Sequence, residues 1–175
     1  MTGDPAICII AHRGASRAAP ENTLSAIRAA LIEGADGIEL DVRLTRDDEP
    51  ILMHDPDLLR TTGDPRPVAH CMFSDLAALD AGAWFGRDYI GERIPHLDEA
   101  LSAAAGFRVI NLDLKHDPGF STALGERVLA SVQASPVAPR CHLTVSDSLL
   151  LSFCLEHAPD VPTGRLVESP GTAWP

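Results

Sequence analysis

Clustered cysteines, an excess of basic residues and a long hydrophobic run are all missing from this chain of 175 residues. The four cysteines are scattered and form no C-x-x-C pair, so they indicate neither a zinc site nor a disulfide framework. The chain has 14 Lys and Arg residues against 25 Asp and Glu residues, which gives a formal net charge of −11. This charge argues against a nucleic-acid backbone or an anionic membrane as partner, because both attract clustered cations.

The beginning of the chain lacks the features of a targeting or membrane-spanning segment. Residues 1–5 contain no Lys or Arg, and the apolar run behind them is too short for a signal peptide or a transmembrane helix. We therefore expect a cytoplasmic protein without a transmembrane segment. Hydrophobic residues make up 45% and charged residues 22%, an ordinary globular balance, and the length suits a single domain over residues 1–175.

Short β-rich apolar runs alternate with segments of helical periodicity. The first run, residues 7–11, predicts a strand buried on both faces. A helix follows it, with Asn22 or Thr23 as the N-cap. The alternation as a whole predicts a parallel α/β fold. Strands are predicted at 7–11, 37–42, 50–56, 107–114, 142–145 and 163–167, and later helices at 97–106, 122–134 and about 147–156.

Residues 57–94 interrupt this alternation with several Gly and Pro residues and with the aromatic residues Trp84, Phe85 and Tyr89. A connection of this length inside a compact α/β unit is usually functional. We expect it to form a lid or a wall of the binding site. The alternative is a surface insertion that packs on itself.

Polar side chains gather at the C-terminal ends of the first four predicted strands, on one face of each. Glu39 and Asp41 alternate with apolar residues and therefore share a face, although a half-exposed strand with both acids in water would show the same pattern. In a (β/α)8 barrel, catalytic residues come from the C-terminal ends of several strands and meet at one face. Four strands thus supply one candidate site. Its members are His12, Arg13, Glu39, Asp41, His54, Asp113 and Lys115.

The types of these side chains indicate the chemistry of the site. The carboxylates of Glu39, Asp41 and Asp113 are hard oxygen donors, which suit Mg²⁺, Ca²⁺ or Mn²⁺ better than zinc. Arg13 and Lys115 are cations that fit an anionic substrate such as a phosphate ester.

Two histidines complete the set. The imidazoles of His12 and His54 can exchange protons near neutral pH, as acid–base hydrolysis requires. The combination indicates a metal-assisted phosphodiester hydrolase that acts on a small molecule.

At these residues the chain resembles the glycerophosphodiester phosphodiesterases. The motifs that carry the resemblance are His12-Arg13-Gly14, Pro20-Glu21-Asn22-Thr23, Glu39-x-Asp41 and His54-Asp55, in this order and at this spacing. The resemblance implies a (β/α)8 barrel that hydrolyses glycerophosphodiesters to glycerol 3-phosphate and an alcohol. It also implies that His12 and His54 form the acid–base pair, that Glu39 and Asp41 bind the metal, and that Arg13 binds the phosphate. Residues 57–94 would be a small insertion over the site, facing the glycerol moiety.

Departures from the family pattern change two of these expectations. The later motif usually has Glu two residues before Lys, whereas this chain has Asp113 before Lys115, so the third metal contact is expected to be long, water-bridged or absent. A complete barrel typically has about 250 residues. We therefore expect a C-terminally truncated barrel with about six of eight βα units, whose open sheet edges could support self-association.

Two alternatives to this function stay open. The first is a related phosphodiesterase that acts on lysophospholipids or phosphoinositides, because the pocket walls decide the head group. The second is an inactive, incomplete barrel that only binds metal or a phosphorylated ligand.

Overall fold

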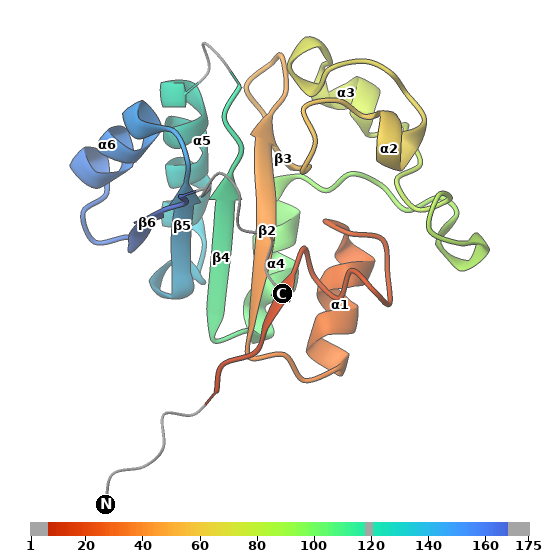
Figure 1. Ribbon diagram of the computed structural model, residues 1–175, viewed down its shortest axis with the longest axis horizontal. Helices are drawn as coiled ribbons and strands as arrows, with labels where there is room; N and C mark the ends of the chain where they lie inside the picture. The colour runs from red at the N-terminus through yellow and green to blue at the C-terminus, as the bar shows by residue number, and fades with distance from the viewer. Residues whose placement is uncertain (1–6, 118–120, 168–175) are drawn as a thin grey trace, which may run out of the picture.

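The computed structural model describes residues 7–117 and 121–167 of the chain. In this part, six strands form one curved sheet in the order β1-β2-β4-β5-β6, with β3 attached to β2 (Figure 1). Five strands run parallel, as the sequence predicts. The strands are β1 (Ile10–His12), β2 (Gly37–Leu44), β3 (Pro50–Leu52), β4 (Val109–Leu114), β5 (Cys141–Val145) and β6 (Thr163–Arg165).

The longer helices cover one face of the sheet, as in the outer ring of a barrel (Figure 1). They are α1 (Leu24–Ile32), α4 (Leu97–Ala103), α5 (Ser121–Ala134) and α6 (Ser148–His157), and a 3₁₀ turn at Ala104–Gly106 continues α4. Among the described residues, no helix is both long enough and apolar enough to cross a membrane.

The main hydrophobic core lies between the sheet and these helices. Ile38, Leu40 and Val42 of β2 are fully buried there, together with alternate residues of β4 and β5. Because side chains alternate along a strand, the residues between them point to the opposite, concave face. The polar residues of β2, Glu39 and Asp41, stand on that face.

The third strand differs from the expected parallel arrangement. β3 runs antiparallel to β2, with Val42 opposite Leu52 and Leu44 opposite Pro50. The connection between these strands is far shorter than the dozen or more residues that a parallel crossover needs, so a hairpin is the feasible solution. β2 therefore extends past the level of Asp41, and β3 returns to it, where the Met53 amide donates to the Asp41 carbonyl over 3.1 Å.

The first strand also differs from its prediction. Strand β1 is shorter than residues 7–11 and is not buried on both faces, since Ile9 is 60% and Ile10 is 39% exposed. Within the described residues, β1 pairs with β2 alone. Its apolar composition is that of an interior barrel strand, but among the described residues one edge has no strand partner and Ile10 is only partly covered.

Residues 57–94 form a small unit with a hydrophobic core of its own. Leu58, Val68 and Leu76 are fully buried in it, against Ile51 of β3. The end of the segment is tied to α1, because Ser25 donates its amide and its hydroxyl to the Glu92 carboxylate over 3.2 and 2.5 Å. The insertion contains the helices α2 (Leu59–Thr62) and α3 (Phe73–Leu76) and 3₁₀ turns at Val68–His70 and Arg87–Tyr89.

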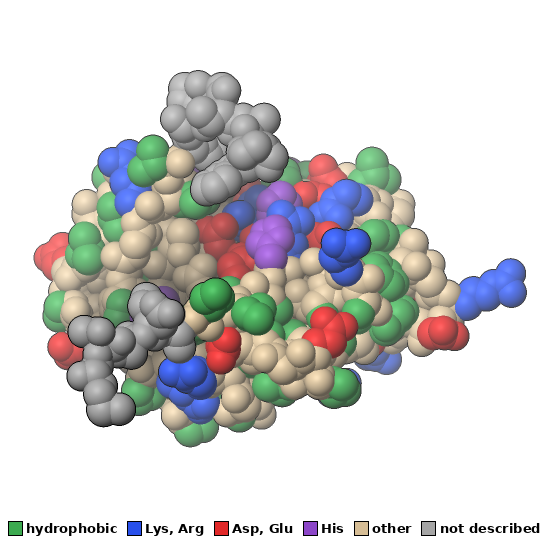
Figure 2. Space-filling view, turned by 60° about the horizontal axis from the view of Figure 1, so that its bottom comes forward, with side chains coloured by type: hydrophobic (Ala, Val, Ile, Leu, Met, Phe, Trp, Pro, Cys, Tyr) green, Lys and Arg blue, Asp and Glu red, His purple; other side chains and the backbone are tan. Residues whose placement is uncertain are grey.

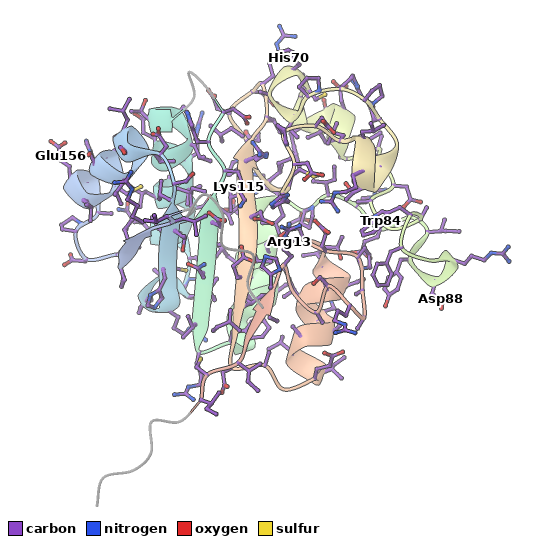
Figure 3. All side chains as sticks on the ribbon, in the orientation of Figure 1. Arg13, His70, Trp84, Asp88, Lys115 and Glu156 are labelled. Atoms are coloured by element: carbon purple, nitrogen blue, oxygen red, sulfur yellow. The ribbon has the colours of Figure 1, made fainter. Side chains whose placement is uncertain are left out.

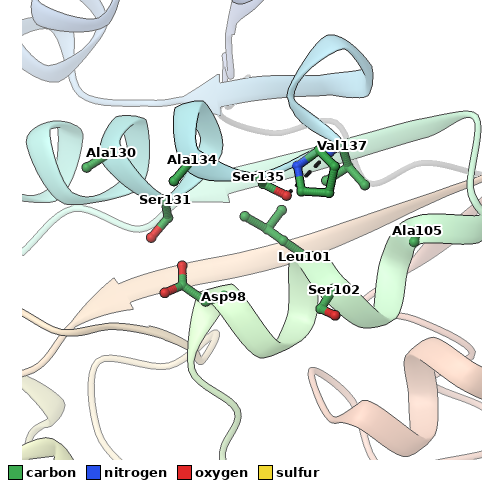
Figure 4. A pocket seen from close by; sticks show the side chains of 10 residues that line it. Asp98, Leu101, Ser102, Ala105, Ala130, Ser131, Ala134, Ser135 and Val137 are labelled. Atoms are coloured by element: carbon green, nitrogen blue, oxygen red, sulfur yellow. Dashed lines mark hydrogen bonds between the residues drawn. The ribbon is translucent and has the colours of Figure 1, made fainter.

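On the outer surface, a groove of about 540 Å³ separates α4 from α5 (Figure 4). Small or aliphatic side chains such as Leu101, Ala130 and Ala134 line most of it, and Asp98 stands at one end. None of the predicted site residues lines this groove. The candidate site therefore lies elsewhere, on the concave face of the sheet.

Candidate active site

The predicted carboxylates come together because of the sheet register. Asp41 of β2 and Asp113 of β4 are direct neighbours across the parallel pair, and Glu39 lies two residues before Asp41 on the same face. One oxygen from each of these three residues lies within 4.8 Å of the others. Figure 2 shows histidine side chains among acidic and basic ones at the centre of this side of the molecule. The expected metal-binding triad is thus assembled in space.

Asp41 is the most enclosed member of the triad, at 1% exposure. Asn22 donates from Nδ2 to its Oδ2 over 2.7 Å, and the Asp41 amide donates to Asn22 Oδ1 over 3.1 Å. The helix N-cap is Thr23, whose hydroxyl oxygen accepts from Ala26. Asn22, the other candidate cap, instead adopts a left-handed φ of 55° and orients Asp41. Asn adopts a positive φ more readily than most residues, which fits its place here.

The two predicted phosphate-binding cations lie inside the cluster. Lys115 Nζ is 3.1 Å from Asp41 Oδ1 and 2.5 Å from Asp113 Oδ2. Burial lowers the pKa of Lys115, but the hydrogen bond to Asp113 and the charges of both aspartates outweigh it, so the pKa is raised and the ammonium stays charged. Figure 3 shows Lys115 beside the β4 edge of β2 and Arg13 beside its other edge.

Arg13 reaches the site through an unusual backbone conformation. Its φ is 57°, its amide donates to Glu39 Oε2 over 2.9 Å, and its Nε lies 3.1 Å from Asp41 Oδ2. Gly14 follows with a φ of 79°, and a Cβ there would lie 2.7 Å from the Cβ of Ala26. The glycine of the His12-Arg13-Gly14 motif is therefore required by close contact with α1.

The crowding of buried carboxylates changes the ionisation of Glu39. Burial and the neighbouring Asp41 charge raise the pKa of Glu39 to about 7, against an ordinary 4.5. The folded protein therefore binds a proton on the Glu39 carboxylate more tightly than the unfolded chain does. The contribution of Glu39 to the stability of the metal-free protein falls as the pH rises from about 4.5 to about 7.

Metal binding should displace this proton. We expect the affinity for a divalent cation to rise with pH up to about 7 and then to level off. Calorimetry in buffers of different ionisation enthalpy should show about one proton released per ion near pH 6 and almost none near pH 8.5. Glu39→Gln is the matched variant and should show no such release. A wild-type protein that releases no proton near pH 6 would contradict the assignment.

His12 borders the carboxylate cluster, and His54 directly follows Met53, which pairs with Asp41 through its amide. His12 ends β1, and its Nε2 is 3.8 Å from Glu39 Oε2. Desolvation by neighbouring groups, followed by the Arg13 charge, lowers the pKa of His12, which favours the neutral imidazole. His54 follows β3, and its Nδ1 is 2.7 Å from Asp55 Oδ1. The hairpin thus delivers His54 to the level of Asp41, although not by the parallel strand that was predicted.

Sequence reasoning missed two arginines near the site. Arg43 is 7% exposed and donates to the His54 carbonyl from Nε and Nη2 over 3.0 and 2.9 Å, and to Asp117 from Nη1 over 2.9 Å. It continues the polar parity of Glu39 and Asp41, a signal that could have found it. Arg60 lies in the insertion and forms ion pairs with Glu21 and Asp55, which lie outside it. No local sequence pattern predicts this role of Arg60.

The residues present fit a hard divalent cation. Asp41 Oδ1 and Arg13 Nε are buried and form no hydrogen bond of suitable geometry within the described residues. Asp41 Oδ1 has the Lys115 ammonium 3.1 Å away as its ion-pair partner. A cluster of carboxylate oxygens of this kind is the donor set that Mg²⁺ or Ca²⁺ prefers. Asp113 belongs to this cluster in spite of its shorter side chain.

Comparison with known proteins agrees with this arrangement. The chain is 32% identical over 161 residues to a glycerophosphodiester phosphodiesterase of Caldanaerobacter subterraneus, covering 91% of the chain and 66% of that protein. It is also 32% identical to a glycerophosphodiester phosphodiesterase of Bacillus subtilis, with coverage of 93% and 60%. The chain thus spans two thirds or less of the length of these relatives.

Solved structures show the same fold. A phosphodiesterase of Oleispira antarctica, in complex with the product sn-glycerol-3-phosphate, superimposes with a TM-score of 0.88 at 30% identity, covering 96% of this chain and 69% of that one. Glycerophosphodiester phosphodiesterase of Agrobacterium tumefaciens gives a TM-score of 0.81 at 34% identity, with coverage of 89% and 65%. The predicted TIM-barrel type is confirmed, and the described part of the chain contributes six strands to it.

A sequence model of one family covers most of the chain. The model of the Glycerophosphoryl diester phosphodiesterase family matches residues 12–157, which include every predicted site residue. The chain belongs to the Glycerophosphoryl diester phosphodiesterase family.

Proposed function

We propose that this chain hydrolyses glycerophosphodiesters to glycerol 3-phosphate and an alcohol. The observation that supports this most directly is the meeting of two histidines with a triad of carboxylates and two cations on the concave face of the sheet. The similar Oleispira protein was solved with sn-glycerol-3-phosphate, which fits this reaction as its product.

The cations and the carboxylates would divide the work of binding. Glu39, Asp41 and Asp113 would hold Mg²⁺ or Ca²⁺, with Mn²⁺ as a further candidate, and a bound ion would supply Lewis-acid charge at the phosphate. Arg13 and Lys115 would bind phosphate oxygens, because their N–H groups line the same cluster. They would also offset negative charge that develops in the transition state.

The histidines would move protons on either side of the phosphorus. One of them removes a proton from the attacking group, which is water or the substrate's own neighbouring hydroxyl, as its oxygen bonds to phosphorus. The other gives a proton to the alkoxide oxygen as the phosphorus–oxygen bond to the alcohol breaks. Where the neighbouring hydroxyl attacks, water then opens the cyclic phosphate to give glycerol 3-phosphate. His54 offers Nε2 for this exchange, because its Nδ1 is engaged by Asp55.

A product assay tests the reaction. Glycerophosphocholine is incubated with the protein and Mg²⁺ or Ca²⁺, and glycerol 3-phosphate is measured with a coupled dehydrogenase. We expect metal-dependent release of glycerol 3-phosphate. Release of a different phosphomonoester from lysophospholipids or glycerophosphoinositol, with none from glycerophosphocholine, would favour the related phosphodiesterases. Metal binding without turnover of any of these diesters would favour a binding function.

Self-association is a separate proposal. Among the described residues, the outer edges of β1 and β6 have no strand partner, and exposed Ile9 lies beside the first edge. Unpaired edges of this kind pair readily with another chain. Sedimentation measurements over a range of protein concentrations would detect such association.

A further inference from the structure

A continuous series of ion pairs connects His54 with Arg13. His54 Nδ1 lies 2.7 Å from Asp55 Oδ1, and Arg60 Nε donates to Asp55 Oδ2 over 2.6 Å. The Nη1 and Nη2 groups of Arg60 donate to the two Glu21 oxygens over 2.8 and 2.7 Å. Glu21 Oε1 also accepts from Arg13 Nη1 over 2.9 Å. Arg60 is the central member, since it contacts a carboxylate on each side.

The central arginine comes from a different part of the molecule than its partners. Arg60 stands on α2, the first helix of the insertion, whereas Glu21 precedes α1 and Asp55 follows β3. Its guanidinium carbon also lies 6.0 Å from the centre of the Trp84 ring, another part of the insertion. The insertion therefore reaches the candidate site through this side chain.

The geometry requires the planar fork of arginine. One edge donates two hydrogen bonds to Glu21 while Nε serves Asp55, which a single ammonium group cannot reproduce with the same directions. Arg60 is 41% exposed, so solvent screens these pairs and their contribution to stability is small. Orientation of the two carboxylates is the larger effect that the arrangement can have.

The charge on Asp55 determines which nitrogen of His54 carries the proton. Burial raises the pKa of Asp55, but the hydrogen bonds from Arg60 and His54 outweigh it and bring the pKa to about 2. An ionised carboxylate can only accept, so Nδ1 of His54 must donate. Nε2 is then left free to exchange a proton with substrate.

We propose that Arg60 is a positioning residue that orients two groups at once, the imidazole of His54 through Asp55 and the guanidinium of Arg13 through Glu21. The inference rests on the proposed function, in which His54 transfers a proton and Arg13 binds the phosphate. It gives residues 57–94 a defined role in the site.

Steady-state kinetics can separate the two branches. We expect Asp55→Asn to lower kcat by about 10- to 100-fold with little change in KM, the size of effect seen when a group that orients a functional side chain is lost. Glu21→Gln should mainly raise KM, because Arg13 loses its anchor. Arg60→Ala should do both, and Arg60→Lys should recover part of the loss. Arg66→Ala is the matched control, since Arg66 lies in the same insertion and pairs with Asp64.

A spectroscopic measurement tests the proposal without activity. Nitrogen-15 NMR of the neutral His54 ring should report the Nδ1–H form in the wild-type protein and in Arg66→Ala. Arg60→Ala and Asp55→Asn should shift it toward the Nε2–H form. If Arg60→Ala fails to fold, Arg60→Lys and Asp55→Asn provide the same comparison.

An Arg60→Ala protein that loses only thermal stability, with the kinetic constants and His54 tautomer of the wild type, would overturn the positioning role. A wild-type protein that turns over no glycerophosphodiester would refute the proposed function instead. In that case the tautomer alone decides, because an unchanged tautomer in Arg60→Ala refutes the role and a changed tautomer supports it.

Discussion

Replacing His54 with alanine is expected to lower kcat for glycerophosphocholine by about 10²- to 10⁴-fold, the usual contribution of a positioned general acid or base. The same range is expected for His12→Ala. The reason is that His12 Nε2 lies 3.8 Å from Glu39 in the carboxylate cluster. His54, whose ring is held by Asp55 at 2.7 Å, directly follows Met53, whose amide donates to the Asp41 carbonyl.

His70→Ala is the matched control for this experiment. His70 is exposed at the end of a 3₁₀ turn of the insertion and lies apart from Arg13 and Lys115 (Figure 3), so its loss should leave kcat unchanged. Thermal melts of all three variants check that the fold is kept. Full activity in either His12→Ala or His54→Ala would refute the pair, because each proton transfer needs its own group.

Removing the metal is expected to have an effect of comparable size. A chelator should abolish turnover, and Mg²⁺ or Ca²⁺ should restore it. A Lewis acid at a phosphoryl oxygen contributes several kcal/mol of transition-state stabilisation, or on the order of 10²- to 10³-fold in rate. Asp41→Asn should reproduce this loss at ordinary metal concentrations, because the buried centre of the triad then loses its charge.

The same variant should also lower the stability of the metal-free protein. Asp41 is 1% exposed and lies 3.1 Å from both Arg13 Nε and Lys115 Nζ. Losing one partner of a buried ion pair typically costs about 3–5 kcal/mol, because the remaining charges are left without compensation. Thermal and urea melts without metal measure this loss. Asp98→Asn, in the first turn of α4 and outside the site, is the control for removing an acidic charge.

Glu39→Gln distinguishes loss of metal from loss of fold. Because burial and Asp41 raise the pKa of Glu39 to about 7, a neutral side chain suits this position when no metal is bound. We therefore expect Glu39→Gln to keep or increase the stability of the metal-free protein near pH 8 while it weakens metal binding. Wild-type metal affinity in both Glu39→Gln and Asp41→Asn would refute the triad.

The sequence by itself determined which face of the strand carries the site residues. Alternation along a strand is a property of the backbone, so the shared side of Glu39 and Asp41 could be derived without tertiary information. The same holds for the terminal positions of His12 and Lys115, and for the family, whose motifs are local runs of residues.

Tertiary structure decided how the functional groups are held. Arg60 and Glu21 are 39 positions apart, and no periodicity links them; they meet because the insertion packs beside the site. The hairpin that returns His54 to Asp41 depends on a short connection that forbids a parallel crossover. Asn22 orients Asp41 because Thr23 already caps the helix. These contacts depend on chain packing in three dimensions, which local sequence patterns do not encode.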